Sequence, residues 1–206
     1  MKVFLIDIDN TLYSKTSGIF DIIDKRINDY MKDIVHIEEN RINSLRIRYW
    51  KQYGTSLLGL MKHYGVDPNH FLDFVHDLDI KPLIKENKNI LKILKKIDAV
   101  KIAFTNAPKE HAVKVLDSLN ITNQFVDIFD IRSADFLGKP NKRPYIKIIN
   151  KTNAKRYAMI DDSYINLKTA QELGAFTILI GDKKYENINL SIEKFEDLDP
   201  EIINNL

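Results

Sequence analysis

The 206-residue sequence contains no cysteine, which excludes disulfide bonds, thiolate catalysis and zinc sites built from cysteine. It also lacks the glycine-rich nucleotide loop G-x-x-x-x-G-K and the zinc-protease motif H-E-x-x-H. No apolar run reaches transmembrane length, and the N-terminus lacks the basic and apolar stretches of a signal peptide. The net charge of +2 is too small for a general nucleic-acid-binding protein. We therefore expect a soluble cytoplasmic protein that binds neither nucleic acid nor membranes.

The apolar residues are grouped in a way that predicts the fold class. Five short apolar runs have the length of strands: Val3–Ile8, Val100–Thr105, Val126–Ile131, Tyr157–Ile160 and Phe176–Ile180. Helix-like segments separate the later runs: Asn87–Lys96, Lys109–Leu119, Tyr145–Lys151 and Ile165–Leu173. This alternation predicts an α/β fold, in which a Rossmann-like parallel sheet is covered by helices on both faces.

The stretch from Ile19 to His76 is different, because it has no strand-like run and shows helical periodicity throughout. We expect four helices here, inserted as an α-helical cap between the first strand and the rest of the sheet. The predicted boundaries are residues 1–14 and 82–206 for the core and 15–81 for the cap. One amphipathic face of the cap is expected to contain Ile19, Ile22, Ile23, Ile27, Tyr30 and Met31.

Two carboxylates follow the first apolar run at once. Because side chains alternate along a strand, Asp7 and Asp9 start on the same side where the strand ends. Two close carboxylates in a buried setting need a cation, a proton or both. Such a pair suits metal-assisted phosphoryl chemistry, in which one carboxylate attacks and the other moves a proton. The alternative is an ordinary turn with both acids solvated.

Polar residues also follow the second predicted strand and precede a later helix. Thr105 and Asn106 follow Phe104, where they are suited either to bind a phosphate oxygen or to begin a helix. Lys139 lies between Gly138, which permits close backbone approach, and Pro140. A lysine held there is suited to pair with a phosphate and with the Asp7 carboxylate. Two nearby cations compete for this role, Lys142 and Arg143.

A second pair of acids ends the fourth predicted strand. Asp161 and Asp162 are followed by Ser163 and Asn166, a set that suits a hard cation that prefers oxygen ligands. Helix capping explains one of these acids, but it explains two successive acids less well. In a parallel sheet the carboxyl ends of the strands share one edge, so we expect both pairs of acids to lie near the lysine and the threonine.

The order of these motifs resembles that of the haloacid dehalogenase-like hydrolase superfamily. The four motifs D-x-D-N-T, T-N, K-P and D-D-S-x-x-N occur in sequence and span nearly the whole chain. More narrowly, D-I-D-N-T-L-Y followed by Gly18-Ile19 resembles the pyrimidine 5'-nucleotidase subfamily. So does the cap segment Tyr49-x-x-x-Tyr53-Gly54-x-x-x-x-Gly59-Leu60. The resemblance implies a Rossmann-like core with an α-helical cap, and a Mg²⁺ cofactor.

The resemblance also implies a role for each motif residue. Asp7 would be the nucleophile that forms an aspartyl-phosphate, and Asp9 would protonate the leaving oxygen and then activate water. Thr105 would bind the phosphate together with Asn106, and Lys139 would steady both Asp7 and the phosphate. Mg²⁺ would be held by Asp7, the Asp9 backbone carbonyl, Asp161 and Asp162. As an acid near neutral pH, Asp9 is expected to have a raised pKa.

In this superfamily the cap chooses the leaving group, which directs attention to its basic and aromatic residues. The expected substrate-binding residues are Asn10, Asn106, Arg46, Tyr49, Trp50 and Tyr53. The alternative is that Tyr49 and Trp50 form the cap core. The five histidines lack accompanying carboxylates, which favours surface or packing roles over metal binding.

The resemblance predicts a phosphomonoester hydrolase for a small phosphorylated metabolite, with a pyrimidine nucleoside 5'-monophosphate favoured. The superfamily's dehalogenases lack Asp at the position of Asp9, and its transport ATPases have Thr there, so Asp9 favours a phosphatase or a phosphomutase. A sugar-phosphate phosphatase, a phosphomutase and a non-catalytic binding protein remain as alternatives. The sequence does not give the oligomeric state.

Overall fold

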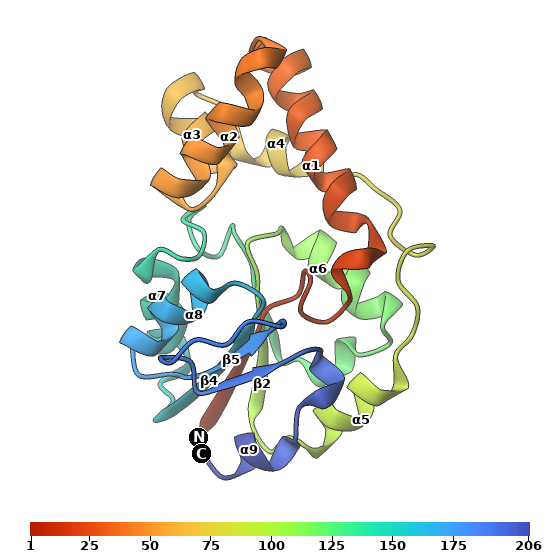
Figure 1. Ribbon diagram of the computed structural model, residues 1–206, viewed down its shortest axis with the longest axis vertical. Coiled ribbons are helices and arrows are strands. Elements are labelled where there is room, and N and C mark those ends of the chain that lie inside the picture. Colours follow the sequence, from red (N-terminus) through yellow and green to blue (C-terminus); the bar gives the residue numbers. More distant parts are fainter.

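The computed structural model describes residues 1–206, and a parallel sheet lies at the centre of its core (Figure 1). The strand order in this sheet is β3-β2-β1-β4-β5-β6. The strands are β1 (Lys2–Ile6), β2 (Val100–Phe104), β3 (Asp127–Phe129), β4 (Arg156–Asp161), β5 (Phe176–Ile180) and β6 (Leu190–Ile192). Strand β1 lies in the middle and pairs with β2 and β4. The predicted α/β fold with a parallel sheet is confirmed.

Helices cover both faces of this sheet, as a continuous apolar run in a strand requires. One face packs against α5 (Lys88–Lys96), α6 (Lys109–Ser118) and α9 (Pro200–Asn204). The other face packs against α7 (Lys142–Thr152) and α8 (Tyr164–Glu172). Along β1 the side chains alternate between the two cores: Phe4 and Ile6 join the first, and Val3 and Leu5 join the second.

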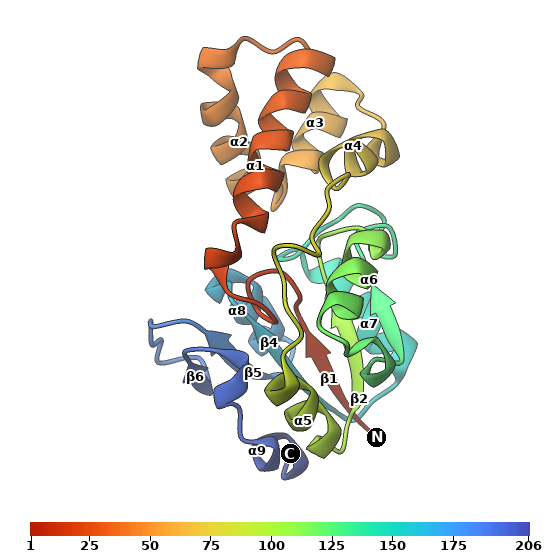
Figure 2. The same ribbon diagram turned by 90° about the vertical axis from the view of Figure 1, so that its right-hand side faces the viewer.

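Four helices form a separate group beyond the carboxyl ends of the strands, and we call this group the cap (Figures 1 and 2). They are α1 (Ile19–Asp29), α2 (Glu39–Tyr53), α3 (Ser56–Tyr64) and α4 (Pro68–Val75). Helix α1 continues into a π-helical turn at Tyr30–Ile34. Two glycines in the left-handed region end α2 and α3, namely Gly54 (φ 85°) and Gly65 (φ 64°).

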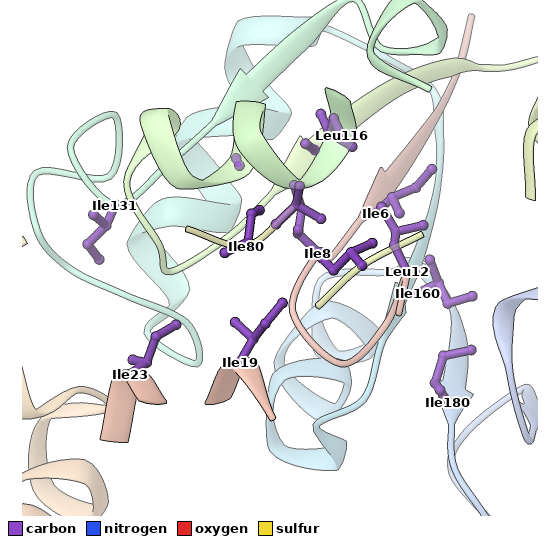
Figure 3. Packing of buried hydrophobic residues seen from close by; sticks show 14 of the residues in the cluster. Ile6, Ile8, Leu12, Ile19, Ile23, Ile80, Leu116, Ile131, Ile160 and Ile180 are labelled. Carbon is purple, nitrogen blue, oxygen red and sulfur yellow. The ribbon is translucent and has the colours of Figure 1, made fainter. Parts of the chain in front are cut away.

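One apolar core runs from the cap into the sheet. Ile19 and Ile23 of α1 belong to the same buried cluster as Ile8 and Leu12, which follow β1, and Ile80, which follows the cap (Figure 3). The two crossings between cap and sheet are therefore anchored by apolar packing. This packing holds the cap over the strand ends.

Two sequence predictions about the elements are wrong. Ile22 is 37% exposed and does not belong to the buried face of α1, because that face is built around Ile19 and Ile23. The sheet has a sixth strand, β6, that the apolar pattern did not indicate. It contains only three residues at the edge of the sheet, all of them half-buried. None of the helices is long and apolar enough to cross a membrane.

Candidate active site

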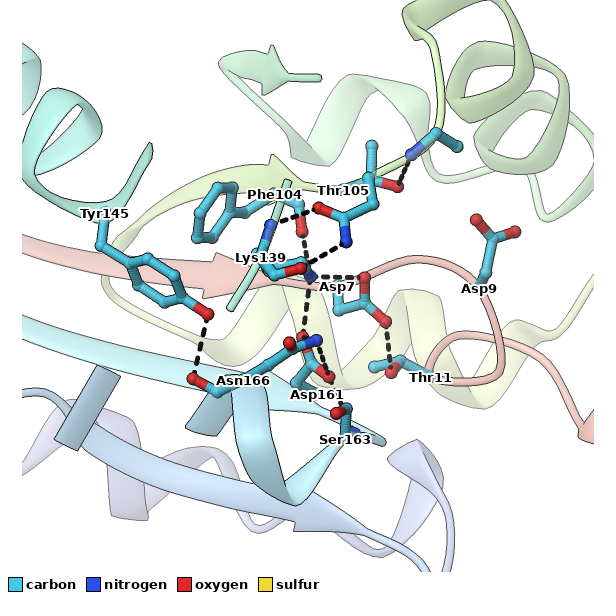
Figure 4. Close-up of polar contacts among 12 residues, drawn as sticks. Asp7, Asp9, Thr11, Phe104, Thr105, Lys139, Tyr145, Asp161, Ser163 and Asn166 are labelled. Carbon is cyan, nitrogen blue, oxygen red and sulfur yellow. Dashed lines mark hydrogen bonds and ion pairs between the residues drawn. The ribbon is translucent and has the colours of Figure 1, made fainter. Parts of the chain in front are cut away.

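Asp7 follows β1 directly, and its two oxygens have different partners (Figure 4). Oδ1 accepts a hydrogen bond from Lys139 Nζ at 2.8 Å, and Oδ2 accepts one from Thr11 Oγ1 at 2.9 Å. The Asp7 backbone N–H donates to the carbonyl of Ile160 in β4, which extends the sheet pairing by one residue. The carboxylate is therefore fixed at the edge of the sheet, where parallel α/β folds place their sites.

Lys139 is 2% exposed, and its ammonium contacts three oxygens. Besides Asp7, it donates to Asp161 Oδ2 at 2.7 Å and to the Phe104 carbonyl at 2.7 Å. Burial opposes the charged form, but Asp161 and Asp7 outweigh it and raise the pKa of Lys139. The competing cations lie elsewhere: Lys142 pairs with Glu172 at the surface, and Arg143 is exposed.

The loop that carries Lys139 is hydrogen-bonded to the core and packs closely against the cap. Asn106 donates from Nδ2 to the Lys139 carbonyl at 3.0 Å, and its Oδ1 accepts the Lys139 backbone N–H at 2.7 Å. Oδ1 and one Nδ2 hydrogen of Asn106 are therefore engaged with this loop, while the second Nδ2 hydrogen has no partner and Asn106 lines the cleft. At Gly138 a Cβ would lie 2.6 Å from Thr55 Cγ2 of the cap. The close approach that the sequence predicted for Gly138 is real.

Thr105 lies at the end of β2, where its backbone N–H donates to the Phe129 carbonyl at 3.1 Å. Its Oγ1 accepts the Ala107 N–H at 3.0 Å, which leaves the hydroxyl hydrogen able to donate. Neither Thr105 nor Asn106 caps α6, whose N-terminal flanking residue is Pro108. Thr105 lines the same cleft as Asp7 and Lys139.

Three carboxylates form the one acidic cluster suited to a metal ion. Asp7, Asp161 and Asp162 each offer one oxygen, and these oxygens lie within 4.8 Å of one another. Burial, with Asp161 and Asp162 adding to it, raises the pKa of Asp7 well above its ordinary value, while Lys139 opposes the shift. Burial and Asp161 likewise raise the pKa of Asp162. Crowded oxygens with excess negative charge fit a hard divalent cation such as Mg²⁺.

The carboxylate of Asp9 lies apart from this cluster (Figure 4). Its Oδ1 accepts hydrogen bonds from Tyr13 at 2.6 Å and from His111 Nε2 at 2.7 Å. Its backbone carbonyl accepts no hydrogen bond, so that oxygen is free for a cation. Burial would raise the pKa of Asp9, but the His111 ring and the Tyr13 hydroxyl lower it to about 2. The prediction of a raised pKa is wrong for this state of the protein.

A cleft of about 1300 Å³ lies between the cap and the edge of the sheet. The core contributes Asp7, Asp9, Asn10, Thr105 and Lys139 to its lining, and Asp162 as well. The cap contributes three large apolar side chains that are about half exposed, namely Phe20 (46%), Ile47 (49%) and Trp50 (51%). The side-chain oxygen of Asn10 is buried without a partner. The cleft thus has several acidic groups on the core side, and on the cap side it has exposed apolar and aromatic side chains among charged and polar ones such as Arg46, Lys51 and Lys62.

The predicted cap residues do not all face this cleft. Tyr49 is 1% exposed and packs inside the cap, where its ring stacks on His63 at 5.2 Å, so its assignment to the substrate is wrong. Arg46 lines the cleft, but its guanidinium pairs with Asp24 and donates to Asn28 at 2.8 Å. Tyr53 also lines the cleft, with its hydroxyl paired to His63 at 2.8 Å. Among the predicted cap residues that line the cleft, Trp50 is the one whose side chain has no hydrogen-bond or ion-pair partner.

The sequence did not single out His111 or Tyr13. His111 lies on the buried face of α6 beside Ala112 and Val115, and its side chain is 0% exposed. One sequence feature could have identified His111: it is a histidine at a position of an amphipathic helix where an apolar residue is expected. Tyr13 belongs to the motif D-I-D-N-T-L-Y, where only the acids and Asn10 were assigned roles.

Comparison with known proteins gives one family and several similar folds. A model of haloacid dehalogenase-like hydrolases matches residues 1–174. The chain is 26% identical over 210 residues to phosphate metabolism protein 8 of Saccharomyces cerevisiae, and the match covers 92% of this chain but 65% of that protein. Among solved structures, the magnesium-bound HAD-hydrolase YfnB from Bacillus subtilis shares 17% identity over 98% of each chain, with a TM-score of 0.63. A β-phosphoglucomutase from Clostridium difficile shares 17% identity over 98% of this chain and 95% of its own, with a TM-score of 0.66.

Proposed function

The chain belongs to the haloacid dehalogenase-like hydrolases, and on that premise we propose that it is a Mg²⁺-dependent phosphomonoester hydrolase. The observation that carries the proposal is the environment of Asp7. One carboxylate is fixed at the strand end by Lys139 and Thr11, beside Asp161 and Asp162, and opens on a large cleft. This set combines an oriented nucleophile, a buried cation and a divalent-metal site.

In the proposed reaction, an Asp7 oxygen attacks phosphorus, the bond from phosphorus to the leaving oxygen breaks, and that oxygen takes a proton from Asp9. Water then attacks the phosphorus of the aspartyl-phosphate and gives a proton to Asp9, the bond from phosphorus to the Asp7 oxygen breaks, and inorganic phosphate leaves with the Asp7 carboxylate restored. The Thr105 hydroxyl would donate to a phosphate oxygen, and the Lys139 ammonium, whose three N–H groups are engaged in the structure, would stabilise the developing charge electrostatically. The lowered pKa of Asp9 favours its ionised form in the free protein, and the negative charge of a bound phosphate ester would favour its protonation.

A magnesium ion would be held by Asp7, Asp161, Asp162 and the Asp9 carbonyl, and when bound it would neutralise charge on the phosphate. Two further facts support this cofactor. The structurally similar YfnB binds magnesium. The three carboxylates outnumber the one buried cation among them, so a divalent ion would lower their mutual repulsion.

For the substrate we propose a nucleoside 5'-monophosphate, with a pyrimidine base favoured. The half-exposed Trp50 and Phe20 share the cleft with Asp7, and aromatic faces stack on nucleobases. The subfamily resemblance of D-I-D-N-T-L-Y supports the same class. The chain's relative in yeast is named for phosphate metabolism, which agrees with phosphate chemistry.

The test is phosphate release from a panel of nucleoside monophosphates and sugar phosphates, with Mg²⁺ and with a chelator. Asp7→Asn removes the nucleophile, and Asp98→Asn, at an exposed position, is the matched control. We expect metal-dependent release that Asp7→Asn abolishes and Asp98→Asn retains, with UMP and CMP among the best substrates. No release from any substrate by the folded protein would contradict the proposal, and interconversion of sugar phosphates without release would instead indicate a mutase.

A further inference from the structure

The position of Asp9 is set by two side chains from different parts of the chain. Tyr13 follows β1 and donates to Asp9 Oδ1 at 2.6 Å. His111 comes from α6, about one hundred positions later, and its Nε2 lies 2.7 Å from the same oxygen. Both bonds converge on Oδ1. A carboxylate held by two converging bonds has lost the rotational freedom that a lone aspartate keeps.

The second oxygen of Asp9 is left without a partner. No side chain or backbone N–H donates to Oδ2, and Oδ2 is not among the buried polar atoms that lack a partner, so it keeps contact with solvent. Asp9 lines the cleft together with Asp7. Oδ2 is thus the one oxygen of Asp9 that is free to exchange a proton with a molecule in that cleft.

The polar function of His111 is directed entirely to Asp9. The ring is 0% exposed, and its Nδ1 is buried without a partner, so the bond to Asp9 is the only hydrogen bond that the side chain makes. Burying an imidazole is costly unless it is hydrogen-bonded, which makes a purely apolar packing role a poor explanation. His76, which follows α4, packs edge-on against the ring with centroids 5.1 Å apart and closes the other side.

We propose that His111 and Tyr13 are positioning residues that hold Asp9 by Oδ1 and leave Oδ2 to carry the proton of the reaction. The inference rests on the proposed function, because it takes Asp9 to be the group that protonates the leaving oxygen. Neither His111 nor Tyr13 touches the substrate in this account. Besides lowering the pKa of Asp9, they increase the fraction of time that its carboxylate spends in the productive orientation.

The leaving group provides the test, because 4-nitrophenolate leaves with little help from an acid whereas the 5'-alkoxide of a nucleotide needs a proton. The variants are His111→Leu, which removes the N–H, His111→Gln, which keeps an N–H donor, and Tyr13→Phe, which removes only a hydroxyl. The control is His70→Gln, since the His70 ring also hydrogen-bonds another side chain, the hydroxyl of Tyr30 at 2.9 Å, but away from Asp9. The readout is kcat/KM for UMP and for 4-nitrophenyl phosphate, with folding checked by circular dichroism.

For His111→Leu and Tyr13→Phe we expect kcat/KM for UMP to fall about 10- to 100-fold, and for 4-nitrophenyl phosphate less than about threefold. His111→Gln should recover most of the UMP activity, and His70→Gln should resemble the wild type. Equal losses on both substrates in Tyr13→Phe, or no loss on UMP in any variant, would overturn the inference. Wild-type protein that hydrolyses neither ester would instead overturn the proposed function itself, so the two failures are distinguishable.

Discussion

The Nζ atom of Lys139 lies 2.8 Å from Oδ1 of Asp7, although the two residues are 132 positions apart in the chain. The same ammonium contacts Asp161 and the Phe104 carbonyl and is 2% exposed. Because water does not solvate these charges, each depends on the others for compensation. The contact therefore couples the stability of the sheet edge to the reactivity of the nucleophile.

We predict that Lys139→Met lowers both the stability of the fold and the rate of phosphate release. Loss of one charged donor at a developing charge costs about 10²- to 10³-fold in kcat. Removing one partner of a buried ion pair costs about 3 to 5 kcal/mol, because uncompensated charge stays behind. Urea unfolding and phosphate release measure the two effects. Mg²⁺ should restore part of the stability of this variant, since it would replace the lost positive charge.

The matched control is Lys142→Met, because Lys142 pairs with Glu172 at the surface. Its stability should stay within about 1 kcal/mol of wild type. A Lys139→Met protein as stable as this control in the absence of metal would show that the buried pair does not stabilise the fold.

Asp161 provides a test of the metal site that does not need a substrate. The side chain is fully buried and accepts hydrogen bonds from Lys139, the Ser163 N–H and Asn166. At a Mg²⁺ concentration about 100 times the dissociation constant, wild-type protein should gain about 2.7 kcal/mol of stability. Asp161→Asn should lose this gain, whereas Asp98→Asn should keep it. Thermal unfolding with and without Mg²⁺ measures the difference, and an unchanged gain in Asp161→Asn would place the cation elsewhere.

Much of the fold follows from local sequence because buried parallel strands are continuous apolar runs. Phe176–Ile180 was predicted with its observed bounds, and the cap was predicted as four helices from helical periodicity and from the positions of Gly54, Gly65 and Pro68. Strand β6 was not predicted because an edge strand of three residues needs no apolar run. Ile22 was misassigned because helical periodicity gives a face but not its width, and only the packing around Ile19 and Ile23 decides which positions are covered.

The candidate site was predictable where its residues stand at strand ends, and less so where the partners come from elsewhere. Asp7, Thr105 and Asp161 converge because parallel strands share one carboxyl edge, and Lys139 reaches them from the loop before α7. On α6, the residue that hydrogen-bonds Asp9 is His111. The sequence around His111 does not indicate which residue of another element lies opposite its side chain. Tyr49 illustrates the opposite error: its aromatic character suggested binding, but its neighbour on α3 is a glycine that accommodates its ring.

That glycine gives a prediction about the cap. A Cβ at Gly59 would lie 2.2 Å from Tyr49 Cγ, far inside van der Waals contact. Helix propensity alone favours Gly→Ala by about 1 kcal/mol, whereas overpacking a closed contact costs about 1 to 3 kcal/mol or more. We expect the cost of overpacking to exceed the gain in helix propensity, so Gly59→Ala should be destabilised in urea unfolding. Ser44→Ala, at an exposed site on α2, is the control and should stay within about 0.5 kcal/mol. A stabilised Gly59→Ala would mean that α2 and α3 separate easily.

We predict that His76 makes the stability of the protein depend on pH. Burial and the nearby His111 lower the pKa of His76 to about 4, below its ordinary value near 6.5. The unfolded chain therefore binds a proton more readily than the folded one, so stability is full above pH 6.5 and falls as the pH drops toward 4. Between pH 7.5 and 5 this amounts to about 1 to 2 kcal/mol. His76→Phe should lose less stability over that range in urea unfolding, while His36→Asn, at an exposed site, should behave as the wild type.

Trp50 offers a direct view of substrate binding because it is the only tryptophan in the chain and lines the cleft. In Asp7→Asn, which we expect to bind without turnover, UMP should quench the Trp50 emission and shift it to shorter wavelength, since a stacked base removes water from the ring. Ribose 5-phosphate, which has no base, should leave the emission nearly unchanged. A response to ribose 5-phosphate or to inorganic phosphate as large as that to UMP would mean that the cap moves without contacting the base.

The kinetic counterpart separates binding from chemistry at the same residue. Base stacking on an aromatic ring is worth about 1 to 3 kcal/mol, so Trp50→Ala should raise KM for UMP about tenfold or more while kcat changes little. Trp50→Phe keeps an aromatic face and should recover most of the affinity. KM for ribose 5-phosphate should not respond to either substitution. If instead Trp50→Ala lowered kcat for both substrates equally, Trp50 would act through cap closure, because closure affects every phosphate ester whereas stacking requires a base.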